Sequence, residues 1–484
     1  MKNYQWLAEV RVKVGDKKYS LSTGVPLSRR YILTTGHGVP KPDDKKRQAE
    51  VRFVADFHHK HSWRPAKTVW HGGEELDAAL LDIAELRYDE ASSFHAVHYS
   101  NALPVETKPW EGAGFPAAGK ITAGELTGER DSEGLNGDYL PGGYGKSQLL
   151  ELTVKSPPRI AGKWAGLSGA PVFCESKLIG IIKSCPENFD GHRLAAVSMR
   201  RLLENAELRK LLGYDEREKL LAQQLVKIET LLASSKEVLS ALHAQPALAG
   251  KVKNPKAVAE ALQNMPVEPF ILTVYQASFD KNVRQDKARQ VMEALLGELL
   301  PWLYDAGLVE SVRLNLSPGM LFSLPAATET IAEIILAGVE RRPAAFRRPV
   351  PGEEYPIGEP VIEFPPETGF TPAQDDAASA FDEHMFNKFA RADRHRVGDN
   401  TVLRQLVNRE LNYIATKRMT GRFRHYFICQ VPRTGAENST LLLIQKNYPE
   451  LIFICLSHES LVNERDLCKP LRDFFAPTFG EDAA

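Results

Sequence analysis

The sequence predicts a multidomain chain with an all-β section at its N-terminus, a helical connector after it, and an α/β section at its C-terminus. Three observations lead to this prediction. The chain has 484 residues, whereas one domain usually has roughly 100 to 200. Hydrophobic residues make up 43% of it and charged residues 25%, which is typical of globular proteins. The spacing of apolar residues changes twice, which sets the predicted domains at 1–200, 201–265 and 266–484.

Residues 1–200 contain short runs of β-forming residues that are separated by turns of Gly, Pro, Asp and Asn. The predicted strands are Trp6–Val14, Tyr31–Thr35, Glu50–Phe57, Ala78–Ile83, Leu149–Val154, Ala170–Cys174 and Lys177–Lys183. Many short strands in one section predict a closed or sandwiched β structure.

Residues 201–265 are predicted to be helical. The stretch from Arg200 to His243 is rich in Leu, Glu, Lys and Gln. Its apolar residues recur at alternating steps of four and three with one turn missed at Ser235, and they are Leu221, Leu225, Ile228, Leu232, Leu239 and Leu242. We interpret this as one amphipathic helix that packs in a small bundle. The alternative is an oligomer or partner contact through residues 214–243. A shorter helix is predicted over Lys256–Gln263.

Strands and helices alternate in residues 266–484. The predicted strands are Phe270–Tyr275, Val309–Leu316, His425–Val431 and Leu451–Leu456. The predicted helices are Val283–Tyr304, Ala327–Val339, Ala377–Ala392, Thr401–Met419, Glu437–Asn447 and Asn463–Phe475. Eight prolines predict an extended linker or surface loop over 343–372. The alternation indicates an α/β domain with a partly parallel sheet, which we interpret as a sensor or partner-docking domain.

Charge, hydropathy and cysteine content exclude several classes of protein. The chain has 61 Lys and Arg residues and 62 Asp and Glu residues, which gives a formal net charge of −1. This charge gives no reason to expect nucleic acid or a membrane surface as the main partner. No apolar run approaches the roughly 20 residues that span a bilayer, and the first 14 residues lack the pattern of a signal peptide. Five cysteines do not form a disulfide framework. We therefore expect a cytoplasmic protein with no membrane span.

Three short stretches of the β section carry residues suited to one chemistry. They are YILTTGHGV at 31–39, ELDAALLDI at 75–83 and GLSGAPVF at 166–173. Acyl transfer needs a hydroxyl, an imidazole that takes its proton, a carboxylate that orients the imidazole, and backbone N–H groups for the oxyanion. The combination of His37, Asp77 and Ser168, about 40 and 90 residues apart, supplies these groups, and the glycines beside Ser168 allow a sharp turn.

These stretches resemble the motifs of chymotrypsin/trypsin-like serine proteases of the bacterial cytosolic kind. Thr23-Gly24-Val25 and Leu33-Thr34-Thr35-Gly36-His37 are similar to the strand before the catalytic His, Asp77-Ala78-Ala79-Leu80-Leu81 to the Asp strand, and Gly166-Leu167-Ser168-Gly169-Ala170-Pro171 to the nucleophile turn. The resemblance implies two six-stranded antiparallel barrels. It also implies His37 as base and then acid, Asp77 as its orienter, Ser168 as nucleophile, and the backbone N–H groups of Gly166 and Ser168 as the oxyanion hole.

The sequence departs from this family in ways that bear on activation and specificity. Leu167 stands where cleavage-activated relatives have an Asp, so we expect no activation by N-terminal cleavage. Gly38 stands where a Cys often follows the catalytic His, which agrees with a reducing compartment. Cys174 and Cys185 are expected to be free thiols. Gly162 stands where relatives that cut after Lys or Arg carry an Asp. We expect Gly162, Lys163, Ile182 and Ser184 to border the substrate pocket, with a small, apolar or acidic preference.

Three other signals favour ordinary structure over function. Residues 142–147 lack the first glycine of a phosphate loop. Residues 58–61, HHKH, lack further metal ligands at a useful spacing, so no metal and no cofactor are expected. The basic stretch 391–424 is interpreted as a solvated helix face, with nucleotide or nucleic-acid recognition as the alternative.

We therefore predict an intracellular serine endopeptidase that cleaves a protein substrate. Its layout resembles bacterial effectors of conflict or antiphage systems, which implies a regulatory partner or ligand for residues 201–484. The alternatives are a catalytically inactive scaffold or sensor with the same fold, and a general quality-control protease. The natural substrate, the activating signal and the oligomeric state do not follow from the sequence.

Overall fold

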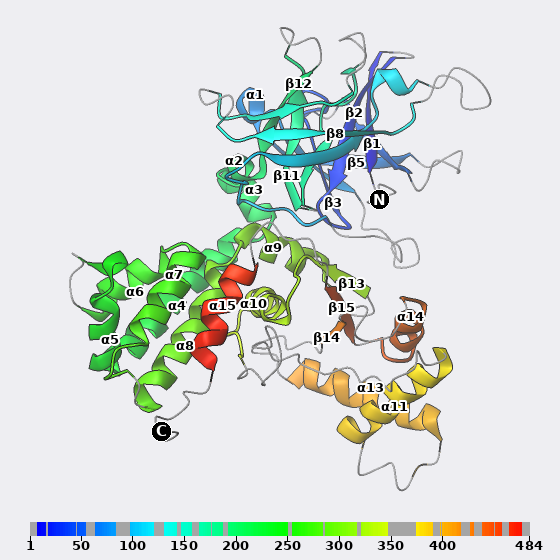
Figure 1. Ribbon diagram of the computed structural model, residues 1–484. Helices are drawn as coiled ribbons and strands as arrows, with labels where there is room; N and C mark the ends of the chain where they lie inside the picture. Colours follow the sequence, from blue (N-terminus) through cyan, green and yellow to red (C-terminus); the bar gives the residue numbers. More distant parts are fainter. Residues whose placement is uncertain are drawn as a thin grey trace. The chain divides into compact units, whose positions relative to one another are not determined.

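The computed structural model places the chain in two compact units, which Figure 1 shows as ribbons. Unit 1 comprises residues 1–215 and 305–315, and unit 2 comprises residues 216–304 and 316–484. The described residues are 7–15, 18–44, 46–54, 63–83, 97–120, 130–142, 147–156, 164–175, 177–186, 192–249, 254–283, 286–316, 321–346, 374–390, 397, 399–417, 426–429, 438–449, 451–456 and 464–476. Among them, no helix is both long enough and apolar enough to cross a membrane.

The first half of unit 1 is a closed six-stranded barrel with the strand order β1-β2-β3-β6-β5-β4. Its strands are β1 (Ala8–Gly15), β2 (Lys18–Pro26), β3 (Tyr31–Thr34), β4 (Ala49–Phe53), β5 (Arg64–His71) and β6 (Ala79–Ile83). A short helix, α1 (Gly73–Leu76), precedes β6. All neighbouring strands are antiparallel. Val10, Val12, Val51 and Leu81 fill the barrel because alternate residues of a strand point to the same side.

The second half of unit 1 is another closed barrel, with the order β10-β11-β12-β9-β8-β7. Its strands are β7 (Lys108–Gly114), β8 (Glu133–Leu140), β9 (Leu150–Thr153), β10 (Pro171–Cys174), β11 (Lys177–Ser184) and β12 (Arg193–Ser198). A single 3-10 turn, η3 (Ala117–Gly119), follows β7. The two antiparallel barrels confirm the predicted chymotrypsin-like double barrel.

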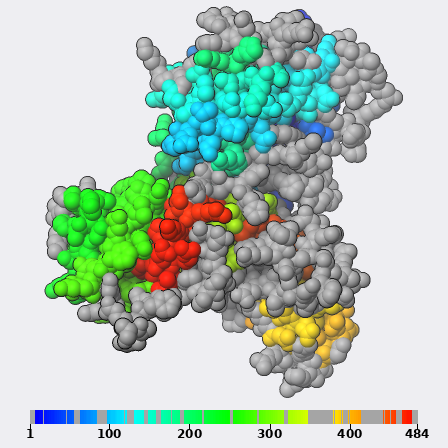
Figure 2. Space-filling model, in the orientation of Figure 1, coloured from blue at the N-terminus to red at the C-terminus, as the bar shows by residue number. Residues whose placement is uncertain are grey.

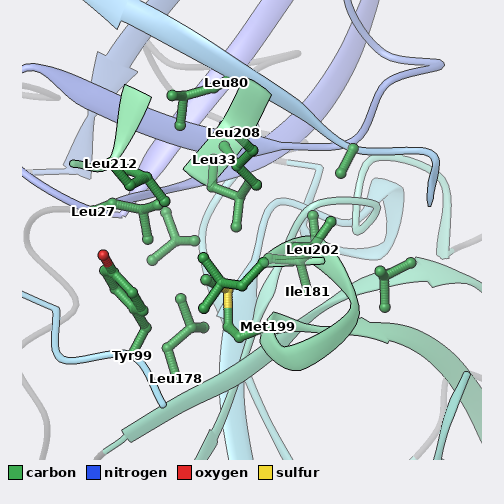
Figure 3. Packing of buried hydrophobic residues seen from close by; sticks show 14 of the residues in the cluster. Leu27, Leu33, Leu80, Tyr99, Leu178, Ile181, Met199, Leu202, Leu208 and Leu212 are labelled. Atoms are coloured by element: carbon green, nitrogen blue, oxygen red, sulfur yellow. The ribbon is translucent and has the colours of Figure 1, made fainter. Parts of the chain in front are cut away.

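A shared apolar core joins the two barrels to the helices that follow them, α2 (Met199–Leu202) and α3 (Ala206–Leu211) (Figure 3). Its members include Leu33, Leu80, Leu178, Ile181, Met199, Leu202, Leu208 and Leu212. The compact unit therefore extends past residue 200, to Asp215. These compact units therefore have other limits than the predicted domains, which were divided at residues 200 and 265.

One further helix of unit 1 comes from much later in the chain. Helix α9 (Ala306–Asn315) occupies the region where the strand Val309–Leu316 was predicted, so that prediction was wrong. Ser311 Oγ donates to the carbonyl of Val97 at 2.8 Å, and Asn315 Nδ2 donates to the carbonyl of Leu27 at 2.9 Å. Leu308, Val309 and Val312 are buried at the helical spacing of three and four residues, and this packing prevails over their β propensity.

The first part of unit 2 is a bundle of helices. They are α4 (Tyr214–Ala233), which begins in unit 1, α5 (Lys236–His243), α6 (Pro255–Gln263), α7 (Val267–Ala277) and α8 (Asp286–Leu303), with the turn η6 (Pro246–Leu248). The predicted single helix from Arg200 to His243 is wrong, because it is divided into α2 to α5. Ser235, where the apolar pattern misses a turn, caps α5 by accepting a hydrogen bond from the N–H of Val238.

The strand predicted over Phe270–Tyr275 is also wrong, because this segment lies in α7. Phe270, Ile271, Val274 and Ala277 are buried at the spacing of one helix face. The C-terminal helix α15 (Glu464–Phe475) packs against α7, and Figure 2 shows its surface beside that of the other bundle helices.

The rest of unit 2 contains a three-stranded parallel sheet in the order β13-β15-β14, which confirms the predicted α/β character. Its strands are β13 (Leu321–Leu324), β14 (Tyr426–Cys429) and β15 (Ile452–Leu456), and the helices are α10 (Glu329–Glu340), α11 (Gln374–Phe389), α13 (Asn400–Lys417) and α14 (Asn438–Asn447). Most of the proline-rich loop 343–372 and much of the basic stretch 391–424 lie outside the described residues. Arg404, within that stretch, is paired with the buried Asp382.

Candidate active site

The register of the first barrel brings His37 and Asp77 to the same end of the sheet. Strands β3 and β6 are paired so that Thr34 lies opposite Ala79. His37 follows Thr34 by three residues and Asp77 precedes Ala79 by two, so both residues lie just beyond the paired strands at one edge.

The two side chains are hydrogen-bonded. His37 Nδ1 lies 3.0 Å from Asp77 Oδ1 and 2.9 Å from Oδ2, and the backbone N–H of His37 donates to Oδ1 at 2.9 Å. The Asp77 side chain is only 12% exposed, whereas that of His37 is 54% exposed. An ionised carboxylate only accepts hydrogen bonds, so this contact places the proton on Nδ1 and leaves Nε2 as the basic nitrogen.

Asp77 reaches this position through a left-handed backbone conformation at the end of α1. Its φ is 47° and its N–H donates to the carbonyl of Gly73 at 2.9 Å. Asp adopts this conformation more readily than bulky residues do. The turn thus aims the carboxylate at the loop that carries His37.

His71 connects the loop that carries His37 to the turn that carries Asp77 through two hydrogen bonds. Its Nε2 donates to the carbonyl of Gly36 at 3.0 Å, and its Nδ1 accepts from the N–H of Gly73 at 3.1 Å. Gly36 immediately precedes His37, and Gly73 begins α1, which ends directly before Asp77. This positioning role could not be predicted from the sequence, because an isolated His at the end of a strand gives no signal for it.

The hydrogen bond to Asp77 raises the pKa of His37 above its ordinary value of 6.5. Burial acts in the opposite direction, the negative charge of Asp77 raises the pKa further, and the positive charge of Lys183 lowers it. The imidazole is therefore a stronger base than a free histidine.

Lys183 was not singled out from the sequence, although it lies between the predicted pocket residues Ile182 and Ser184. Its Nζ donates to the carbonyl oxygens of Glu74 and Glu75 at 3.2 and 3.3 Å. These carbonyls belong to α1, directly before Asp77. Lys183 thus joins strand β11 of the second barrel to the Asp77 loop of the first.

Ser168 lies in a tight turn that leads into β10. Gly166 and Gly169 have φ values of +97° and +87°, which are open to glycine and unfavourable for other residues. The carbonyl of Ser168 accepts from the N–H of Thr23 at 2.8 Å. A Cβ atom on Gly169 would lie 2.8 Å from Thr34 Oγ1, so the turn packs against the end of β3, three residues from His37.

The backbone of this turn leaves two donors unused. The N–H groups of Leu167, Gly169 and Ala170 donate to protein carbonyls. Within the described part of the chain, the N–H groups of Gly166 and Ser168 have no acceptor, and no hydrogen bond joins the Ser168 hydroxyl to His37. Gly166 and Ser168 are the two residues predicted to form the oxyanion hole.

The residues predicted to border the substrate pocket are only partly described. Gly162 and Lys163 lie outside the described residues. Ile182 is buried and pairs with the serine turn, because its carbonyl accepts from Gly169 and its N–H donates to Ala170. Ser184 is exposed at the end of β11. The pocket assignment stays a prediction.

The described cysteines and acidic residues show no covalent or metal chemistry. Within the described part of the chain no disulfide involves Cys174 or Cys185, as predicted, nor Cys455 or Cys468. Burial raises the pKa of the Cys185 thiol, which disfavours the reactive thiolate. No group of three or more His, Cys, Asp and Glu residues among those described is placed to hold a metal ion. The histidines of 58–61 lie outside that set.

Solved structures similar to this chain include the active form of the Rv3671c protease from M. tuberculosis, with 13% identity, 42% of this chain and 79% of that chain covered, and a TM-score of 0.29. HL collagenase has 13% identity, coverage of 43% and 94%, and a TM-score of 0.34. A scabies mite inactivated protease paralogue has 14% identity, coverage of 42% and 92%, and a TM-score of 0.31. No protein-family model and no curated protein matches the sequence. Since one fold serves many functions, a function has to come from the geometry of the site.

Proposed function

We propose that the chain is a serine endopeptidase with Ser168 as nucleophile, His37 as general base and then acid, and Asp77 as the group that orients His37. The observation that carries the proposal is the bonded pair of His37 and Asp77, packed beside a serine turn with two unused N–H donors. A hydroxyl, an imidazole, an orienting carboxylate and backbone donors are the groups that acyl transfer requires.

The proposed reaction follows from the tautomer of His37. Nε2 takes the proton of the Ser168 hydroxyl while Oγ attacks the carbonyl carbon of the scissile peptide. The N–H groups of Gly166 and Ser168 donate to the resulting oxyanion. His37 then gives its proton to the leaving amine, and a water molecule repeats the sequence on the acyl-enzyme. The absence of a hydrogen bond between Ser168 and His37 is compatible with this role, because such bonds often form only with substrate.

Labelling with a fluorophosphonate tests the proposal without knowledge of the substrate, because this reagent phosphonylates an activated serine. The full chain should be labelled, and Ser168→Ala should abolish labelling. A matched control is Ser147→Ala, in a turn between β8 and β9 of the same barrel, which should label like the wild type. Equal labelling of the wild type and Ser168→Ala would contradict the role of Ser168, and no labelling of the wild type would favour the alternative, a catalytically inactive scaffold.

The proposal includes regulation of unit 1 by unit 2, as in an effector protease of a bacterial defence system. Its support is the path of the chain, which leaves unit 1 after Asp215, returns as α9, and leaves again after Asn315. A partner or ligand that changes unit 2 can therefore act on the protease through α9. The lack of a disulfide at the four described cysteines is compatible with the proposed cytoplasmic location.

Two substitutions in α9 test this coupling. Ser311→Ala and Asn315→Ala remove the bonds of α9 to Val97 and Leu27. If α9 carries the regulation, the double variant should change the labelling rate of the full chain by several fold under conditions in which urea unfolding shows the variant to be fully folded. A labelling rate equal to that of the wild type would contradict a regulatory role for α9. A protease for general quality control would instead degrade unfolded proteins broadly without any partner.

A further inference from the structure

We propose that Arg130 is a positioning residue that keeps the oxyanion hole open by holding the peptide bond between Ala165 and Gly166 in one orientation. The inference rests on the proposed function and assigns a new residue to that site. Arg130 lies at the start of the segment that leads into β8, far in sequence from all three motifs.

The first line of support is the hydrogen bonding of the Ala165 carbonyl. It accepts from Arg130 Nη1 at 2.6 Å and from the N–H of Ala117 at 2.8 Å. The same Nη1 donates to the carbonyl of Phe115 at 3.1 Å. Arg130 thus ties the serine turn to the segment that follows β7. A bond from a charged guanidinium is stronger than one between neutral groups.

This bonding determines the direction of the proposed oxyanion donor. In a trans peptide the C=O and N–H bonds point in opposite directions. The two donors that hold the Ala165 carbonyl on one side therefore direct the N–H of Gly166 to the other side. That N–H is one of the two that have no acceptor among the described residues.

The peptide bond between Ala165 and Gly166 can rotate because residue 166 is a glycine, so hydrogen bonds are needed to hold it in one orientation. Glycine has no Cβ to restrict φ, so the peptide before it rotates more easily than other peptides. A rotation by half a turn would put the Ala165 carbonyl oxygen where the oxyanion forms. The catalytic donor would then be replaced by an acceptor.

The space around Gly166 shows that Arg130 is packed for this role. A Cβ on Gly166 would lie 1.9 Å from Arg130 Nη1 and 2.5 Å from the Phe115 carbonyl. The guanidinium therefore fills the position of a side chain at 166. The glycine at this position is required by Arg130 as well as by the turn.

The peptide on the other side of Gly166 is held too. Thr23 Oγ1 donates to the Gly166 carbonyl at 2.9 Å and accepts from the N–H of Phe115 at 3.1 Å. Both peptides that flank Gly166 are thus fixed, one by Arg130 and one by Thr23. The donors are arranged before substrate binds, which is the condition for strong electrostatic stabilisation of the transition state.

The test compares Arg130→Met and Arg130→Lys with the wild type in the full chain. Arg11→Met is the matched control, because Arg11 is a partly buried arginine of unit 1 whose partner is Glu50. The probes are a fluorophosphonate and the active ester p-nitrophenyl acetate. Complete loss of one oxyanion donor lowers the rate about 10²- to 10³-fold. Since Ala117 still holds the carbonyl, we expect labelling of Arg130→Met to fall about 10- to 100-fold, and that of Arg130→Lys to fall less.

Two readouts separate positioning from a general structural role. The KM for p-nitrophenyl acetate should stay unchanged while the acylation rate falls, because the donor acts on the transition state. The pH midpoint of labelling should also stay unchanged, because Arg130 is not among the groups that shift the pKa of His37. Arg11→Met should label like the wild type.

Several outcomes would overturn the inference and leave the proposed function intact. They are labelling of Arg130→Met within twofold of the wild type, a shifted pH midpoint, and an equal loss in Arg11→Met. If Arg130→Met does not fold, Arg130→Lys decides, and wild-type labelling of that variant counts against the role. A wild-type chain that is not labelled overturns the proposed function and this inference together.

Discussion

Replacement of Gly169 by Ala should destabilise unit 1 and inactivate Ser168, because the residue after Ser168 has no room for a Cβ. The added atom would lie 2.0 Å from the carbonyl oxygen of Thr23. That oxygen cannot move freely, since it accepts from Thr34 Oγ1 at 2.6 Å, and the N–H of Thr23 donates to Ser168. Relief requires the serine turn to separate from β2.

The magnitude follows from two destabilising contributions and one stabilising contribution. A non-glycine residue in a left-handed conformation costs about 1–2 kcal/mol. Overpacking costs a further roughly 1–3 kcal/mol. In the opposite direction, Ala has less conformational freedom than Gly in the unfolded chain, which stabilises the folded state by about 0.4–1 kcal/mol. The expected net loss is about 2–4 kcal/mol. A displacement of Ser168 by about 1 Å would also slow labelling about 100-fold.

Gly142→Ala is the matched control. Gly142 has a φ of +82° but nothing within 4 Å of its Cβ position, so only the conformational contribution remains, at about 1 kcal/mol. The assay is urea unfolding of the full chain followed by tryptophan fluorescence, which reports mainly on unit 1 because Trp302 is the single tryptophan of unit 2. Equal midpoints for Gly169→Ala and Gly142→Ala, with wild-type labelling in both, would refute this reasoning.

Three further predictions concern His37 and the core. The labelling rate should rise with pH through a midpoint above 6.5, because only neutral His37 is a base and its pKa is raised. Asp77→Asn should lower this midpoint and should reduce the maximal labelling rate at high pH by about 10⁴-fold. Lys183→Met should move the midpoint to higher pH, because it removes a positive charge that lowers the pKa of His37, and an unchanged pH profile would contradict this. Leu208→Ala should destabilise unit 1 by about 2–5 kcal/mol in urea unfolding, whereas the exposed Val226→Ala should stay within about 0.5 kcal/mol of the wild type.

Seven of the twelve described barrel strands follow from the sequence, because burial on one face imposes an alternating pattern, whereas β2, β5, β7, β8 and β12 were not predicted. Tyr31–Thr34 and Ala79–Ile83 were predicted to within one residue. Their closure into two barrels was implied by the resemblance of the motifs and not by periodicity, since a sandwich has the same pattern.

The errors lie where tertiary packing prevails over local propensity. The segments Phe270–Tyr275 and Val309–Leu316 contain several β-branched residues, yet both are helical, because each buries the side chains of one helix face. Short apolar segments are compatible with either structure, so their partners in the fold decide.

The motifs predicted the principal residues of the candidate site but not those that support them. His37 and Asp77 are bonded, and Ser168 lies in a turn that packs near them. Arg130 and Lys183 belong to no motif, because their partners are backbone carbonyls that any residue type can supply. Only the folded chain shows which carbonyls they reach.

The central claim is that Ser168 is an activated nucleophile, and peptide mapping of the fluorophosphonate-labelled full chain tests it most directly. Mass spectrometry should find the phosphonyl group on the peptide that contains Ser168, with a loss of labelling when His37 is replaced by Ala. An adduct on a different serine, or no adduct on the wild-type chain, would contradict the account.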